Sequence, residues 1–115
     1  MLDINIEAQK ALEKTGYNIA FHYPQSMDTI PVVSFYTVSE AGDMSADNCE
    51  MFRTGVVAVD VFCDVPSQSG VMAQQINQVM NEDGWSRISA MDIPEETDGL
   101  FHKSMKFTKS FFMLD

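Results

Sequence analysis

The clearest pattern in the chain is its longest stretch of strong β character, residues 52–63, Phe-Arg-Thr-Gly-Val-Val-Ala-Val-Asp-Val-Phe-Cys, which predicts a β-strand. Alternate residues of a strand point to opposite faces of a sheet. From Val56 onward both sets of side chains are apolar, apart from Asp60. Such a strand is usually interior to a sheet, with material packed on each side. We therefore expect a central strand here, with Asp60 near its end and accompanied by water or a lysine.

Four other segments have strand character, namely residues 17–23, 32–38, 85–93 and 100–112. The last alternates between an aromatic and methionine face and a polar face that begins at His102, so one face is expected to be buried and the other wet. Pro94 and an acidic turn over residues 95–99 predict that the last two strands form an antiparallel hairpin. In the first strand of that hairpin, one face is expected to hold Trp85, Arg87, Ser89 and Met91.

Two segments have apolar residues three and four positions apart, which is the spacing of one helix face. They are residues 4–14, with Ile4, Ala8, Ala11 and Leu12, and residues 67–83, with Met72, Ile76, Val79 and Met80. Asp3 and Ser67 are the predicted N-caps, while Gly16 and Gly84 are the predicted stops.

The element order α-β-β-β-α-β-β predicts one α+β domain over residues 1–115. We expect a single, mostly antiparallel sheet with both helices packed on one face. The helix over residues 67–83 is long enough to connect two parallel strands, so one parallel pair is compatible with the pattern. Residues 39–50 are small and acidic and have no period, which predicts an extended, mobile loop between strands.

The charge balance argues against one class of function, nucleic-acid binding. The chain carries 17 acidic and 7 basic residues, a net charge of -10. Phosphate binding requires clustered lysine and arginine, so nucleic-acid binding is not expected. No apolar run approaches the ~20 residues of a membrane span, and no basic region precedes an apolar one at the N-terminus. We expect a protein made and kept in a cytoplasm, without a membrane partner.

Candidate chemistry is sparse. His22 and His102 lie outside metal-binding spacings, and the phosphate-binding and nucleophile motifs are absent from the sequence. Cys63 with either histidine as its base is the one nucleophile arrangement open on paper. We favour the interpretation that Cys63 is a buried thiol and that the two histidines are surface or interface imidazoles, because no spacing indicates a catalytic geometry. We therefore predict no catalytic residue, no cofactor and no metal.

Two acidic groups and the methionines have an ordinary interpretation. The set Asp43, Asp47, Asn48 and Glu50 lacks the spacing and the glycine of an EF-hand, so a solvated loop is favoured over a Ca²⁺ site. The same holds for the turn residues Glu95, Glu96 and Asp98. Core positions are expected for Met72, Met80, Met91 and Met105. The sequence leaves the disulfide state of Cys49 and Cys63 open.

Three stretches resemble the tail terminator, or tail completion, proteins of long-tailed bacteriophages. They are Arg-Thr-Gly-Val-Val-Ala-Val-Asp-Val-Phe at residues 53–62, Val-Met-Asn-Glu-Asp-Gly-Trp-Ser-Arg at residues 79–87, and Gly-Leu-Phe-His-Lys-Ser-Met-Lys-Phe at residues 99–107. The Thr-Gly-Tyr at residues 15–17 and the Pro-Val-Val-Ser-Phe at residues 31–35 also fit. The resemblance covers nearly the whole chain, and its motifs are mostly the pattern of a fold.

The resemblance implies a structural, non-enzymatic protein that forms a ring, stops growth of the tail tube and joins the tail to the head. Its partners would be copies of itself and the tail-tube and head-completion proteins. Its location would be the virion, after the host cytoplasm. An acidic lumen suits a ring through which DNA passes without binding. The candidate interaction residues are Glu40, Asp43, Asp47 and Glu50, which would line the lumen or dock on a partner.

Two other classes fit the sequence. One is a small α+β ligand-binding or regulatory module, which needs a concave pocket with converging polar groups. The other is a small enzyme, which the lack of a catalytic motif disfavours. The mass in solution distinguishes a ring from a monomer whose melting depends on a ligand.

Overall fold

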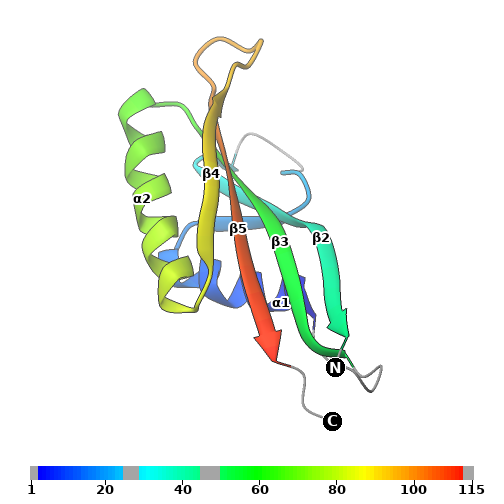
Figure 1. The fold of residues 1–115 in the computed structure, drawn as a ribbon. Helices are drawn as coiled ribbons and strands as arrows, with labels where there is room; N and C mark the ends of the chain where they lie inside the picture. The colour runs from blue at the N-terminus through cyan, green and yellow to red at the C-terminus, as the bar shows by residue number, and fades with distance from the viewer. Residues whose placement is uncertain (1–2, 25–28, 45–49, 113–115) are drawn as a thin grey trace.

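The computed structural model describes residues 3–24, 29–44 and 50–112, and it has an α+β fold (Figure 1). The elements are α1 (Ile4–Leu12), the short 3-10 helix η1 (Glu13–Thr15), β1 (Asn18–Phe21), β2 (Val32–Met44), β3 (Glu50–Cys63), α2 (Pro66–Glu82), β4 (Ser86–Ile93) and β5 (Phe101–Phe112). The five strands form one sheet in the order β1-β2-β3-β5-β4. The predicted fold class is confirmed, and β3 is the central strand.

The sheet is mostly antiparallel, as predicted, but its parallel pair is not where the sequence pattern allowed it. α2 connects β3 to β4, which run in the same direction with β5 between them. The crossover therefore produces no parallel contact. The parallel pair in the described sheet is β1 with β2, from Asn18 opposite Val32 to Phe21 opposite Phe35.

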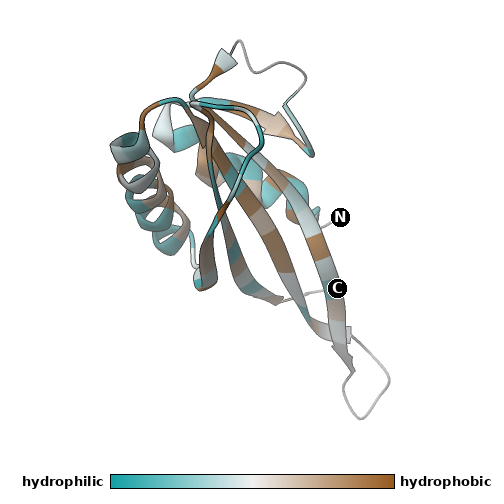
Figure 2. Ribbon diagram, turned by 90° about the horizontal axis from the view of Figure 1, so that it is seen from above, coloured by the Kyte–Doolittle hydropathy of each residue, from teal (hydrophilic) through white to brown (hydrophobic). Residues whose placement is uncertain are grey.

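Both helices pack on the same face of the sheet. Residues from both helices share one buried cluster with the sheet: Ile4, Ala8, Ala11, Leu12, Met72, Ala73, Ile76 and Met80 pack with Val33, Phe35, Val57, Val59, Val61, Cys63, Trp85, Met105, Phe107 and Phe111. We call this side the helix face and the other side the open face. Figure 2 shows apolar residues along the central strands, while the helices alternate between hydrophobic and hydrophilic positions.

The ends of the helices match the predictions except at one cap. Asp3 accepts hydrogen bonds from the amides of Asn5 and Ile6, at 3.0 and 3.3 Å. Gly84 has φ +91°, the left-handed region that favours glycine. Ser67, however, is not the cap of α2, because the helix begins at Pro66 without a side-chain cap. Proline is favoured at this first helical position because its missing N–H would be unsatisfied there in any case.

The strand β4 differs most from its predicted faces. A bulge between Arg87 and Ser89 shifts the alternation, so Arg87 lies opposite the buried Phe107 while Met91 lies opposite Ser104 on the open face. Met91 is consequently 54% exposed and is not a core residue, unlike Met72, Met80 and Met105. One inserted residue moves every later side chain to the other face.

The acidic segment is largely not a loop. β2 continues to Met44 and β3 begins at Glu50, so both strands extend into a long hairpin. Residues 45–49 lie outside the described part of the chain. The loop prediction was wrong for residues 39–44 because pairing with β3 overrides their weak strand propensity.

Gly55 in β3 lies against Ile4 of α1. A Cβ atom added there would lie 2.6 Å from Cδ1 of Ile4. We therefore expect Gly55→Ala to lower the free energy of unfolding by about 1–3 kcal/mol, the usual cost of overpacking a core. Gly70→Ala is the matched control, because no atom lies within 4 Å of a Cβ at Gly70 in α2. Urea unfolding should show no loss for that control, and equal stability of the two variants would contradict the packing of α1 on β3.

Candidate functional site

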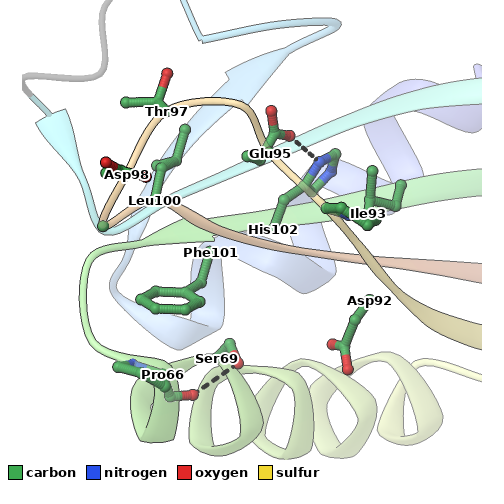
Figure 3. Close-up of a pocket in the computed structure, with 12 residues that line it drawn as sticks. Pro66, Ser69, Asp92, Ile93, Glu95, Thr97, Asp98, Leu100, Phe101 and His102 are labelled. Carbon is green, nitrogen blue, oxygen red and sulfur yellow. Dashed lines mark hydrogen bonds and ion pairs between the residues drawn. The ribbon is translucent and has the colours of Figure 1, made fainter.

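A buried histidine lies between two carboxylates on the open face. His102 in β5 is 9% exposed. Its Nε2 atom lies 2.8 Å from Oδ1 of Asp60. Its Nδ1 atom lies 2.7 Å from Oε1 of Glu95 (Figure 3). The expectations of a surface imidazole, of an Asp60 beside water or lysine, and of a merely solvated Glu95 were therefore wrong. We call Asp60, His102 and Glu95 the histidine cluster.

The strand register explains why these residues meet. His102 lies opposite Phe62 and Asp60 lies opposite Ser104, so the imidazole and the carboxylate share a face two rows apart. Glu95 follows Pro94 in the β4–β5 turn, which bends back over the strand end. The cluster thereby joins the central strand, the last strand and the turn.

The surroundings favour the protonated imidazole. Burial of the ring lowers the pKa of His102 and is the largest single effect. The hydrogen bonds to Asp60 and Glu95 and the charges of both carboxylates act in the opposite direction, and together they raise the pKa above its ordinary value. An imidazolium donates from both ring nitrogens, which matches the two carboxylate contacts. The ring also stacks on Phe62, with centroids 4.1 Å apart.

A cavity of about 150 Å³ lies beside the cluster on the open face, where His22, Tyr36, Ser34 and Ser104 join Asp60 and His102 in its wall. His22 stacks on Tyr36 with centroids 5.9 Å apart, so its ring is held by the second strand. The serines suggest a serine–histidine–aspartate arrangement. Both nitrogens of His102 already face carboxylate oxygens, which leaves that ring no nitrogen with which to accept a serine proton.

The sheet separates the other nucleophile from this imidazole. Cys63 lies opposite Phe101 on the helix face, one residue out of phase with His102. It is fully buried and its Sγ atom donates to the carbonyl of Val65 at 3.3 Å. Burial raises the pKa of the Cys63 thiol, an effect that the charge of Asp64 reinforces and the hydrogen bond to Val65 opposes. A thiol held neutral is a weak nucleophile, so Cys63 is a buried thiol, as favoured above.

The described residues contain no group of three histidine, cysteine or carboxylate side chains that could hold a metal ion. In the histidine cluster, the two carboxylates approach opposite nitrogens of the ring and cannot converge on one ion. Cys49 and Asn48 lie outside the described residues, so neither the disulfide question nor the Ca²⁺ set is tested.

A second cavity, of about 470 Å³, separates the first turn of α2 from the β4–β5 turn (Figure 3). Pro66 and Ser69 form one wall, and Ile93, Leu100 and Phe101 contribute apolar surface. The hydroxyl of Ser69 donates to the carbonyl of Pro66 at 2.9 Å, so this polar group is already satisfied. The cavity is an open hollow, and its wall also includes the polar residues Asp92, Glu95, Thr97, Asp98 and His102.

The four predicted interaction residues are placed as follows. Glu40 lies in β2, and Nη1 of Arg53 donates to its Oε2 atom at 3.1 Å. Asp43 is opposite Phe52 and Glu50 is opposite Met44, so both belong to the β2–β3 hairpin. Asp47 lies outside the described residues. Three of the four therefore belong to one hairpin, and the histidine cluster, which we did not predict, is elsewhere on the sheet.

No protein-family model matches the chain, and no curated protein matches it. In the part of the chain that the structure describes, no helix is long and apolar enough to cross a membrane.

Proposed function

We propose that the chain is a structural assembly protein of a long-tailed bacteriophage or prophage. It caps the tail tube as a ring of identical copies and joins the tail to the head. The observation that carries the proposal is that both ends of its sheet are uncovered within the described residues: β4 pairs with β5 alone, and β2 beyond Phe35 pairs with β3 alone. Monomeric proteins usually shorten, charge or cover such edges, because unpaired backbone groups recruit another chain.

The sequence resemblance supplies the identity of the assembly. Its three stretches correspond to most of β3, to the junction of α2 with β4, and to the first half of β5. These are the structural framework of the sheet. A net charge of -10 suits a ring that DNA traverses, since a surface without clustered cations does not retain phosphate.

The proposal has a direct genetic test. Deleting the gene from its phage or prophage should give tail tubes of uncontrolled length and heads without tails, seen by negative-stain electron microscopy. Supplying the chain from a plasmid should restore joined particles. Tubes of normal length and joined heads in the deletion strain would contradict the proposed function.

A second candidate is a small ligand-binding or regulatory module, which the cavity of about 470 Å³ beside α2 favours. The apolar wall that Ile93, Leu100 and Phe101 form is typical of a small-molecule site. A compound that raises the melting temperature saturably, with the chain monomeric, would favour this candidate over the ring.

The acidic residues provide a prediction about the role of the hairpin. The fourfold variant replaces Glu40, Asp43, Asp47 and Glu50 by Gln or Asn, which removes four negative charges with little change in volume. If the hairpin lines the DNA path, DNA ejection should slow, and most at low salt, because the repulsion that the variant has lost is strongest where salt screens it least. If it docks on a basic surface, the yield of joined particles should fall first. Wild-type ejection and wild-type yield would show that these charges have no role.

A further inference from the structure

The two uncovered edges of the sheet are of nearly equal length. β4 has 8 residues, Ser86–Ile93. At the other end of the sheet, β1 covers only the first four of the 13 residues of β2, and the chain then turns away where the amide of His22 donates to the carbonyl of Phe35 at 2.8 Å. This leaves residues 36–44 with a strand on one side only.

The strand directions of these edges are compatible. β2 is antiparallel to β3, β3 to β5, and β5 to β4, so β4 runs opposite to β2. A ring axis preserves the direction of every strand from one copy to the next. A neighbouring copy that offers its β2 edge to β4 therefore offers an antiparallel strand, which continues the alternation of the sheet across the boundary. Such a head-to-tail contact uses two different surfaces and closes into a ring when the rotation permits.

The charges on the two edges are complementary. Arg87 in β4 is on the helix face, opposite the buried Phe107, and it is exposed and makes no ion pair with any described residue. Glu40 in β2 is also on the helix face, because it lies opposite Gly55, which abuts α1. Glu40 is exposed and contacts Arg53 through Oε2. A carboxylate accepts hydrogen bonds at both oxygens, so Glu40 can serve a second guanidinium.

The surface beside β4 suits an acidic strand. A hollow of about 400 Å³ lies between α2 and β4, and its polar wall consists of Arg87, Lys103, Gln74 and Asn77. Arg87 makes no ion pair with a described residue, whereas Nζ of Lys103 lies 2.9 Å from Oδ1 of Asp92 in β4, so Arg87 is the cation left for an acidic strand. Apolar side chains border both edges: Ile88 in β4 is 55% exposed and Val38 in β2 is 45% exposed. Pairing of the edges would bring a neighbouring strand beside each and cover part of its surface.

We propose that β4 of one copy pairs antiparallel with the free part of β2 of a second copy, with Arg87 opposite Glu40, so that Ser86–Met91 lie opposite residues 36–41. The proposal rests on the proposed function in that it names the surfaces by which the ring closes. It also fixes the register: with Arg87 opposite Glu40, Ser86 lies opposite Ala41. Both of these residues are on the open face, since Ser86 pairs with Thr108 and Ala41 with Thr54.

A cysteine pair tests the register. In a Cys49→Ser background, where the remaining Cys63 is buried, the double variant Ser86→Cys with Ala41→Cys should form a ladder of disulfide-linked oligomers on mild oxidation. Each single variant should give no ladder. The matched control joins Ala41→Cys with Gln78→Cys, an exposed position on α2, and it should also give no ladder.

A charge reversal tests the surface independently. Arg87→Glu should weaken self-association by about tenfold or more, because it sets like charges against each other across the boundary. Lys106→Glu is the matched control: Lys106 is also exposed and without an ion pair among the described residues, but it lies on β5, inside the sheet. It should change the association constant less than threefold.

The outcomes separate the two proposals. The edge pairing is supported if the double variant Ser86→Cys with Ala41→Cys gives a ladder, the control variants give none, and Arg87→Glu weakens self-association. A ring that forms normally with Arg87→Glu and gives no ladder overturns the edge pairing but leaves the ring. A wild-type chain that stays monomeric at every concentration overturns both.

Discussion

Val59→Asp should leave the chain unfolded at room temperature. Val59 is fully buried in the central strand, with Phe35 and Met105 opposite it on the two flanking strands. An aspartate there would be an ionised group in an apolar core, without a partner. Its cost of roughly 5 kcal/mol or more is comparable to the whole stability of a small domain, about 5–15 kcal/mol.

The matched control for this variant is Val71→Asp, the same substitution on the exposed side of α2, where Val71 is 53% exposed. Its free energy of unfolding should stay within about 1 kcal/mol of wild type, which is the scale of helix propensity differences. Circular dichroism and urea unfolding distinguish the two. A cooperative, wild-type-like transition for Val59→Asp would show that β3 has its faces the other way round.

His102→Asn should cost about 3 kcal/mol of stability, or roughly 10 °C in melting temperature. The substitution removes the cation that lies between Asp60 and Glu95 and leaves two carboxylates facing a neutral amide. His22→Asn is the matched control: it replaces the other histidine, which is exposed, and asparagine tolerates its positive φ of 70°. That control should be within about 1 kcal/mol of wild type, and equal losses at both positions would remove the special role of the histidine cluster.

The contribution of His102 should also depend on pH in a defined direction. Its pKa in the folded chain is raised above the ordinary value, about 6.5 in an unfolded chain. The stabilisation is therefore fully present below about pH 6.5, and it is lost as the pH rises through the higher folded value. Urea unfolding at pH 6 and at pH 9 should show the difference between wild type and His102→Asn shrinking at the higher pH. A difference that grows with pH would mean that the imidazole is neutral in the fold.

Sequence reasoning succeeded where one element decides the outcome alone. The apolar spacing of α1 and α2 and the alternation of β5 each reflect burial of a single face, β3 is marked by its valine-rich run, and the structure has all four elements. It failed where two elements decide together. The bulge at Arg87 and Ser89 is invisible in the composition of β4, yet it carries Met91 to the open face. The acidic residues of β2 form a strand because β3 supplies the hydrogen bonds.

The histidine cluster was unpredictable for the same reason. Asp60 was visible as the one charge in an apolar strand, and His102 as the start of a polar face. Their separation of 42 residues becomes a 2.8 Å contact only when the register between β3 and β5 is known. A buried charge in a strand predicts a partner of opposite charge somewhere, and the available candidates were two histidines and seven lysines and arginines. A sequence alone does not choose among them.

The mass of the purified chain in solution tests the central claim most directly. Light scattering across a concentration series should give one closed oligomer, at an integral multiple of 12.9 kDa, whose mass stops rising once it has formed. A closed ring has no free edge left, so further copies cannot add. A mass of 12.9 kDa at every concentration would contradict the ring, and so would a mass that keeps growing, since that is the behaviour of an open filament.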